Sequence, residues 1–475
     1  MRLRTTNTAG TAAARDGRRP VGIDLFSGVG GMSLGFEEAG FDIAVALEYD
    51  PVHAAIHEFN FPLTTVICGD ANHVTPETIR DAAAEGLRRL GRADWDGQID
   101  VIFGGPPCQG FSTIGKRRLD DERNSLVSRF ATFVRTLRPN YFVMENVPGM
   151  AAGGHASILT KLRGQFGPDY VVLPHRILNA ADYGAPQDRK RLILIGHRRD
   201  RAAPGYPWAT VQRAAKRAPI KAAANPEPVL LHALPAGPTV WDAIGDLPDL
   251  DSFRTLLDTD EVRLADGKLQ EMESKSSLYA RRLRGLDIDP GNYGYRRVWD
   301  RALFTSSMRT VHTFESIRRF KLTKGGETED ISRFYRLDPL GLCNTLRAGS
   351  GSERGAFTSP RPLHPRKPRV ISVREAARLH GFPDWFRFNR TKWNGFRQIG
   401  NAVPPPLARA IAGQILSALG IVPTRPHRSL RLGDERLLDM NRLVAAAHFE
   451  ADLDRIPKTR KRLTPEGRDA AFATG

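Results

Sequence analysis

The sequence predicts a doubly wound, mostly parallel α/β sheet with a second, smaller and irregular domain. Over residues 21–200, short apolar runs alternate with helix-like stretches. This alternation is typical of parallel strands joined by helices that cover both faces of a sheet. Over residues 200–340, Pro, Gly, charged and scattered aromatic residues mix with little alternation, which indicates a separate domain. The 475 residues suffice for two to four domains, at about 100–200 residues each.

The elements follow from apolar runs and their flanking turn residues. Strands are expected at VGIDLF (21–26), FDIAVALE (41–48), TTVICGD (64–70), IDVIFGG (99–105), YFVME (141–145), YVVLPHRIL (170–178) and RLILIGH (191–197). Helix-like stretches separate them. A later helix, VREAARLHGF, is closed by Gly381 and Pro383. The last one, PPPLARAIAGQILSALG, opens on prolines, as helix starts tolerate, and ends at Gly420.

These elements divide the chain into five expected segments. They are a loose basic tail (1–20), a main domain (21–200), a second domain (201–396), a helix that completes the main domain (397–420) and a charged extension (421–475). The tail lacks the apolar core of a signal peptide. No apolar run reaches the roughly 18 residues of a membrane span. We therefore expect a cytoplasmic protein with no membrane contact.

Composition narrows the class of partner. The formal net charge is +17 and the pI about 10.1, which favours a polyanion such as nucleic acid over a protein that is merely basic and soluble. The three cysteines show no Cys-x-x-Cys spacing, so neither a disulfide framework nor a zinc site is expected.

The first motif with chemistry is DLFSGVGG (24–31), a strand that runs into a glycine turn and a helix. Such a turn lets a ligand approach the backbone and the free N–H groups of the helix. Glu48 follows 20 residues after Gly28, where an acid can hold ribose hydroxyls. Ser33 stands where a dinucleotide fingerprint needs its third glycine, which disfavours NAD and leaves a smaller adenosyl ligand. Asp70 is as well explained by a helix cap as by an adenine contact.

The second motif, GGPPCQGFS (104–112), places Cys108 after a parallel strand, between prolines and a glycine. Ligands bind at this end of such strands. We interpret Cys108 as a nucleophile and not as a buried structural thiol, the reading that suits Cys68 and Cys343.

The third and fourth motifs supply an acid and two cations. Glu145, in MENV, ends a strand and could act as a general acid or base beside the thiol. Arg189 and Arg191, in QDRKR, lie on one face of an extended chain. Two guanidinium groups there suit an anionic or carbonyl-bearing substrate, the alternative being a solvated basic edge.

In this order the motifs closely resemble those of the DNA cytosine-5 methyltransferase family, of the bacterial restriction-modification type. DLFSGVGG, GGPPCQGFS, ENV and QDRKR match, as do VREAARLHGFPD (373–384) and QIGNAVPPPLARAIA (398–412). The resemblance spans residues 21–412. It implies a class I S-adenosylmethionine-dependent methyltransferase fold, with the irregular domain as the target-recognition domain.

The resemblance also implies a mechanism. Cys108, as thiolate, would add to C6 of a cytosine flipped out of the duplex, so that C5 can attack the methyl sulfonium. Glu145 would protonate N3, and Arg189 and Arg191 would hold the base carbonyl and orient Glu145. Loss of the C5 proton then lets Cys108 leave.

Further contacts are implied by position. Phe26 and Tyr49 (often Trp in the family) would sandwich the adenine, Glu48 would hold the ribose, and Asp70 the adenine amino group. The full set of expected cofactor contacts is Phe26, Ser27, Gly28, Gly30, Gly31, Glu48, Tyr49, Asp70, Ala71, Pro106 and Asn401, and the expected DNA contacts are Gln109, Ser112, Thr345 and Arg347. For Thr345 an ordinary Gly/Ser loop explains the pattern equally well. No metal is expected.

The expected partner is double-stranded DNA, bound by a monomer. Residues 347–397 hold twelve Lys and Arg against three acids, a net charge of +9, which we expect to position phosphates. A cognate restriction endonuclease would act separately, or the enzyme would be an orphan methylase. Three rivals stay open: a transfer-RNA cytosine-5 enzyme, a catalytically idle DNA-binding protein and a nucleotide oxidoreductase.

Overall fold

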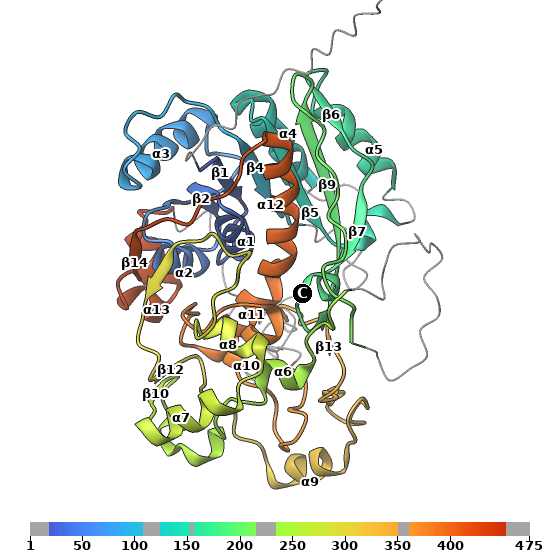
Figure 1. Cartoon of the computed structure of the whole chain (residues 1–475), viewed down its shortest axis with the longest axis vertical. Helices are drawn as coiled ribbons and strands as arrows, with labels where there is room; N and C mark the ends of the chain where they lie inside the picture. The colour runs from blue at the N-terminus through green and yellow to red at the C-terminus, as the bar shows by residue number, and fades with distance from the viewer. Residues whose placement is uncertain (1–18, 108–123, 153–155, 215–233, 350–360, 453–475) are drawn as a thin grey trace, which may run out of the picture.

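The computed structural model describes residues 19–107, 124–152, 156–214, 234–349 and 361–452, and its centre is one large sheet (Figure 1). The strand order is β3-β2-β1-β4-β5-β9-β6, and β7 also pairs with β9. The parallel strands are β1 (Val21–Leu25), β2 (Asp42–Glu48), β3 (Thr65–Cys68), β4 (Val101–Gly104) and β5 (Tyr141–Asn146). The order reverses between β1 and β4, where ligands of doubly wound sheets bind.

The far edge of the sheet is antiparallel. β9 (Lys190–Arg198) runs against β5, and β6 (Tyr170–Val172) and β7 (Arg176–Asn179) run against β9. The run expected as one strand at 170–178 is thus two strands. Pro174 lies between them, and proline lacks the N–H that a continuous ladder needs.

Helices cover both faces of this sheet, as the alternation predicted. One face packs against α3 (Pro76–Arg89), α4 (Asn124–Leu137) and α5 (Ala156–Gln165). The other packs against α1 (Gly31–Ala39) and α12 (Pro405–Leu419), which lie against each other. Figure 1 shows α12, in orange-red, crossing the sheet although it comes some 360 residues after β2.

The second region lies beyond the carboxyl ends of the strands and is built from short elements (Figure 1). They are α6 (Val240–Ile244), β10 (Val262–Arg263), α7 (Asp266–Lys275), α8 (Leu278–Leu283), β11 (Arg296–Val298), β12 (Leu303–Phe304), α9 (Phe314–Leu322) and β13 (Cys343–Asn344). Two small apolar clusters support it. A third, larger cluster joins it to α2 (Pro51–Asn60) of the main domain through α10 (Val373–His380) and α11 (Lys392–Asn401).

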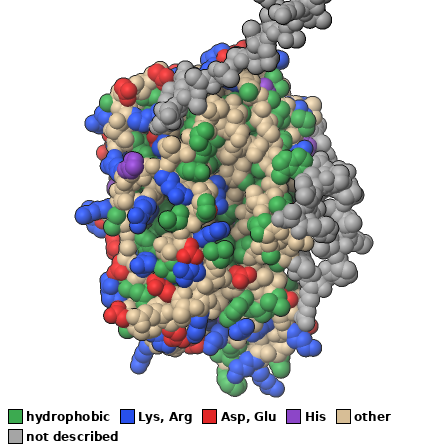
Figure 2. Space-filling view, in the orientation of Figure 1, with side chains coloured by type: hydrophobic (Ala, Val, Ile, Leu, Met, Phe, Trp, Pro, Cys, Tyr) green, Lys and Arg blue, Asp and Glu red, His purple; other side chains and the backbone are tan. Residues whose placement is uncertain are grey.

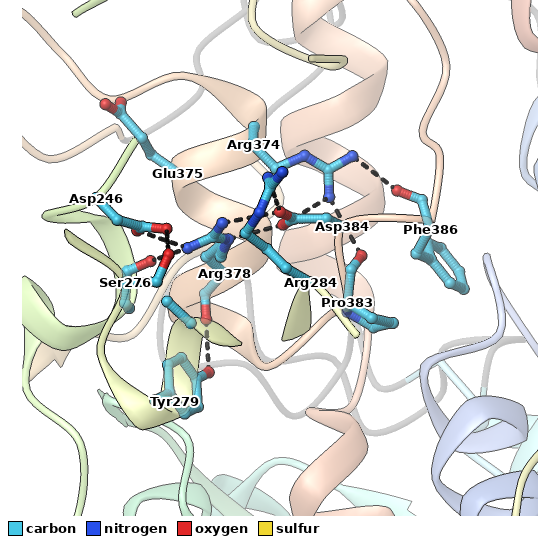
Figure 3. Close-up of polar contacts among 12 residues, drawn as sticks. Asp246, Ser276, Tyr279, Arg284, Arg374, Glu375, Arg378, Pro383, Asp384 and Phe386 are labelled. Atoms are coloured by element: carbon cyan, nitrogen blue, oxygen red, sulfur yellow. Dashed lines mark hydrogen bonds and ion pairs between the residues drawn. The ribbon is translucent and has the colours of Figure 1, made fainter. Parts of the chain in front are cut away.

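Helix α10 carries a buried ionic network (Figure 3). Both Arg378 and Asp384 are buried, and the Arg378 guanidinium donates to Asp384 at 2.7 and 2.8 Å and to Asp246 at 2.8 Å. Arg284 donates to Asp384 at 3.1 Å. Arg374 donates to the carbonyl oxygens of Pro383 and Phe386, which lie on either side of Asp384 in the chain. Because Asp246 and Arg284 belong to the second region, this network fixes that region to α10.

The same burial corrects one expectation about charge. We expected the basic residues of 347–397 to face phosphates, but Arg369, Arg374, Arg378 and Arg387 are each at most 8% exposed. They form internal ion pairs or bind carbonyl oxygens. Figure 2 shows Lys and Arg side chains interspersed with acidic ones over the visible face, rather than in one block.

Both ends of the described chain extend the fold. Arg19, assigned to the loose tail from sequence, pairs with Asp42 at 2.8 Å. In the C-terminal extension, β14 (Ser429–Arg431) pairs with β11, and α13 (Arg436–Asp439) and α14 (Arg442–His448) pack against α2. Leu437 and Leu438 are buried there. The extension therefore contributes to the core at least as far as α14.

Candidate active site

A left-handed glycine turn follows β1. Phe26 has φ 62°, Gly28 56° and Gly30 95°, and a non-glycine residue in this region is strained, a feature found at functional sites. A Cβ added to Gly30 would lie 2.4 Å from the Phe61 ring, so no larger residue fits there. A Cβ added to Gly28 would meet nothing within 4 Å, so the turn borders open space.

Glu48 ends β2 beside this turn. Its Oε2 accepts the Gly28 N–H at 2.7 Å and its Oε1 accepts the Asp50 N–H at 2.9 Å. Each carboxylate oxygen keeps a further lone pair. Ser27 Oγ is buried and has no hydrogen-bond partner in the part of the chain that the structure describes. Open space, a held carboxylate and an orphaned hydroxyl fit a small polar ligand such as an adenosyl group with hydroxyls.

The expected adenine contacts gather after β2 and β3. Burial and the neighbouring Asp70 raise the pKa of Tyr49. Asp70 Oδ1 accepts the Asn72 N–H at 2.9 Å, so the side chain caps a turn, while the N-cap of α3 is Thr75. Ala71 is buried. The turn role and a ligand role remain compatible, because Asp70 keeps its second carboxylate oxygen.

An acid–arginine pair stands at the next strand ends. Glu145, near the end of β5, pairs with Arg191 Nε of β9 at 2.7 Å. Burial raises the pKa of Glu145, although Arg191 and Arg189 oppose the shift. A Cβ added to Gly105 would lie 2.8 Å from Glu145 Oε2, so the loop after β4 passes in close contact with this carboxylate. Pro106 O accepts a bond from Asn146 Nδ2 at 3.2 Å.

In the loop after β4, the residues that the structure describes run as far as Pro107. Cys108, Gln109 and Ser112 therefore lie outside the described residues. The other two thiols are unsuited to nucleophilic chemistry. Burial raises the pKa of Cys68 to about 12, with Glu48 and Asp50 adding to the shift. Burial also raises the pKa of Cys343.

Arg189 has a different environment from Arg191. It is 1% exposed, and its guanidinium donates to the carbonyl oxygens of Leu346 at 2.7 Å, Gly400 at 2.7 Å and Ala402 at 2.9 Å. The side chain thus joins β9 to the start of the C-terminal helices. We expected both arginines to hold the base, but these bonds give Arg189 a positioning role and leave Arg191 as the partner of Glu145.

The remaining predicted residues lie along the same joint. Thr345 Oγ1 donates to Asp188 O at 2.6 Å, which occupies the hydroxyl hydrogen that a DNA contact would use. Arg347 is exposed, and Asn401 is exposed at the end of α11. A Cβ on Gly400 would lie 2.3 Å from Ala348 N, so α11 and the 347–348 chain are in close contact.

Two groups beside the site were not singled out from sequence. Asp24 Oδ2 accepts a bond from Ser33 Oγ at 2.7 Å beneath the glycine turn, and burial raises the pKa of Asp24 to about 8. Asp50 caps α2 and pairs with Arg397 at 2.7 Å. For Asp24 the sequence signal is an acid inside an apolar strand. Only the fold reveals the pair of Asp50 and Arg397, because these two residues are 347 positions apart in the chain.

The described residues hold no cluster of His, Cys, Asp or Glu suited to a metal ion, and none of their helices is long and apolar enough to cross a membrane.

The reversed strand order, the glycine turn held by Glu48 and the nearby Glu145–Arg191 pair define a doubly wound α/β protein with a ligand site at the carboxyl ends of its parallel strands. The model of the C-5 cytosine-specific DNA methylase family matches residues 21–417. The chain belongs to this family, and is a DNA cytosine-5 methyltransferase. Its family implies S-adenosylmethionine as methyl donor and DNA as substrate.

Individual relatives agree. The chain is 48% identical over 433 residues to the Type II methyltransferase M.XorII of Xanthomonas oryzae pv. oryzae, covering 91% of this chain and 92% of that protein. It is 33% identical to the Type II methyltransferase M.AgeI of Thalassovita gelatinovora, over 84% of this chain and 99% of that one. Among solved structures, a protein assigned as a DNA modification methyltransferase, from an E. coli prophage, matches with TM-score 0.63 and 33% identity, covering 84% of this chain and 99% of that chain.

Proposed function

We propose that the protein methylates C5 of a flipped-out cytosine within one duplex DNA sequence, through a covalent bond between Cys108 and C6. The observation that carries this is the Glu145–Arg191 pair, which lies against Gly105, three residues before Cys108. A thiolate from this loop and a buried acid from β5 would meet on one base. The open space at Gly28 lies one strand away, beyond β4.

The residues of the glycine turn would hold the cofactor. Glu48 would accept hydrogen bonds from the ribose hydroxyls. The Ser27 hydroxyl and the N–H groups of the turn would contact the polar end of the cofactor, and the Tyr49 ring would pack against the adenine. S-adenosylmethionine supplies an electrophilic methyl group when bound. The role of these residues would be to hold that methyl group beside C5 of the base.

Protein groups do the rest of the chemistry. The Cys108 sulfur forms a bond to C6 while protonated Glu145 gives its proton to N3, which leaves C5 electron-rich. C5 then takes the methyl group. Loss of the C5 proton to a base re-forms the C5–C6 double bond, breaks the S–C6 bond and returns Cys108 as thiolate. N3 gives its proton back to Glu145, which restores the acid. Burial favours the protonated form of Glu145, which suits it as the acid.

Glu48 provides a test of the cofactor site. Glu48→Gln keeps the shape but replaces one carboxylate oxygen by an amide, so an acceptor for the Gly28 or Asp50 N–H, or for ribose, is lost. We expect about 10- to 100-fold weaker S-adenosylmethionine binding by calorimetry, with DNA affinity unchanged, as a loss of about 1.5–3 kcal/mol for a charged hydrogen bond implies. Equal cofactor affinity would contradict the assignment; Glu77→Gln, at the start of α3, is the control.

The biological setting follows from the relatives. Two of them are named Type II methyltransferases. We infer that the protein belongs to a restriction-modification system, with an endonuclease that reads the same sequence as a separate protein. The recognition sequence itself would be read by the 201–396 region.

Bisulfite sequencing tests the activity directly. DNA from a methylation-free host that expresses the protein should show unconverted cytosines at one recurring sequence. Unmodified DNA from the expressing host, together with methylation of transfer RNA by the purified protein, would favour the RNA enzyme. Unmodified DNA and RNA, with DNA binding retained, would favour the idle binding protein. Cys108→Ser in the same host is the matched control and should leave all cytosines convertible.

A further inference from the structure

Two cations without an acidic partner meet near the start of α11. Arg361 and Lys392 are both partly buried. The Arg361 guanidinium donates to Thr310 Oγ1 at 3.2 Å and lies 5.1 Å from the centre of the Phe396 ring. Lys392 Nζ donates to the Arg309 carbonyl oxygen at 2.5 Å. Each cation thus has one neutral acceptor and is held in place by packing.

No carboxylate in the described part of the chain compensates them. Burial lowers the pKa of Arg361, and burial and then Arg361 lower the pKa of Lys392. In neither case does an acid oppose the shift. His312 lies in the same field, since burial, Arg361, Arg369 and Lys392 lower its pKa, against Asp251 alone. The surroundings of the two cations are therefore electropositive, which favours the neutral form of His312.

A neighbouring arginine shows the contrast. Arg369 is buried but forms two bonds to Glu375, at 2.9 and 2.7 Å, and its pKa is raised because this carboxylate outweighs its burial. Arg369 is thus matched by an internal acid, whereas Arg361 and Lys392 meet none among the described residues. Withdrawing charge from water without a partner costs free energy, and an anion supplied from outside would recover that cost at Arg361 and Lys392.

The position of the pair points to the nature of that anion. Helix α11 begins at Lys392 and ends at Asn401, and the carbonyl of Gly400 near its end binds Arg189, two residues from Arg191. At about 1.5 Å per residue, Lys392 and Gly400 are about 12 Å apart along the helix. A duplex that delivers a base to Glu145 extends well beyond this distance on either side of the base, so its phosphate backbone is the anion that we expect nearest to the pair.

We propose that Arg361 and Lys392 together bind one backbone phosphate of the duplex beside the flipped cytosine, and so set its register without reading its sequence. The inference rests on the proposed function for the placement of the duplex. It singles out two of the twelve basic residues of 347–397. The DNA contacts named individually from the sequence were Gln109, Ser112, Thr345 and Arg347. Thr310 Oγ1 and His312, which border the pair, are further donors for the same phosphate.

The salt dependence of DNA binding tests the pair. Each phosphate contact on B-DNA contributes a slope of about −0.9 to log K against log salt. For the full-length Arg361→Ala/Lys392→Ala protein we expect the slope to become shallower by about 0.9 and affinity at 0.1 M salt to fall about five- to tenfold. The loss should be equal for duplexes with and without the target sequence. Arg361→Lys/Lys392→Arg should keep the wild-type slope.

Lys268→Ala is the matched control, since this exposed lysine on α7 is paired with Glu271 at 2.9 Å and should leave the slope unchanged. A double variant with wild-type melting temperature, cofactor affinity and salt slope would overturn the proposal. If the double variant does not fold, Lys392→Gln alone must still shift the slope. Because duplex binding is measured, a failure of the methylation assay leaves this result independently readable.

Discussion

Glu145→Gln is expected to slow methyl transfer about 10²- to 10⁴-fold in single-turnover assays, with DNA and S-adenosylmethionine affinities near wild type. The amide keeps the size of the side chain and can still face Arg191, but it has no proton to give to N3. General acid catalysis is worth about that factor. The acid must be protonated to act, and burial raises the pKa of Glu145. The wild-type rate is therefore expected to fall as pH rises through that raised pKa, and the variant should lose this limb.

Its control is Glu85→Gln, which removes another arginine-paired carboxylate, at the surface of α3. This variant should methylate at the wild-type rate. A Glu145→Gln enzyme within tenfold of wild type would show that Glu145 only positions the base.

The second large effect concerns stability. Asp384→Asn should lower the free energy of unfolding by about 3–5 kcal/mol, the range for breaking a buried ion pair from one side. Asp384 accepts bonds from Arg378 and Arg284, with Arg374 at 3.8 Å. Its loss leaves three buried guanidinium groups, of which Arg378 keeps Asp246 and Arg284 keeps only Glu273, at 3.9 Å. Urea unfolding followed by circular dichroism measures the change.

The pKa of Asp384 determines how this stabilisation depends on pH. Burial alone would raise the pKa of Asp384, but Arg378 and its neighbours outweigh burial and hold the pKa at about 2, against about 3.9 in an unfolded chain. The stabilisation is thus present above about pH 4 and lost as pH falls toward 2. Asp384→Asn should flatten this acid limb. Glu271→Gln, an exposed carboxylate paired with two lysines, is the control, and an Asp384→Asn midpoint equal to it would contradict the network's role.

Local patterns predicted the fold where local chemistry decides it. The five parallel strands begin and end within about three residues of the expected runs, because apolar runs and glycine turns are local signals. The antiparallel edge was missed, since strand direction depends on partners that lie far along the chain. The glycine turn, Glu48 and Glu145 were expected at one edge because parallel strands end there. The association of Arg191 with Glu145 was implied only by the family resemblance, since β9 runs antiparallel to β5.

The sequence alone does not distinguish the environments that residues of the same type occupy in the fold. Arg189 and Arg191 look equivalent in an extended chain, yet only Arg191 meets Glu145, while Arg189 binds carbonyl groups supplied by residues 346–402. The basic residues of 347–397 also differ in their environments. Arg378 and Arg387 pair with Asp246 and Glu261, a relation that no local pattern records, whereas Arg361 and Lys392 meet no acid among the described residues.

Covalent trapping tests the central claim most directly. A duplex with 5-fluorocytosine at the target cytosine cannot lose the C5 substituent, so the enzyme should remain bonded to it after methyl transfer. We predict a denaturant-stable protein–DNA band that requires S-adenosylmethionine and is absent with Cys108→Ser. A wild-type enzyme that methylates ordinary duplex but forms no such band, or a Cys108→Ser enzyme that still forms it, would contradict the covalent mechanism.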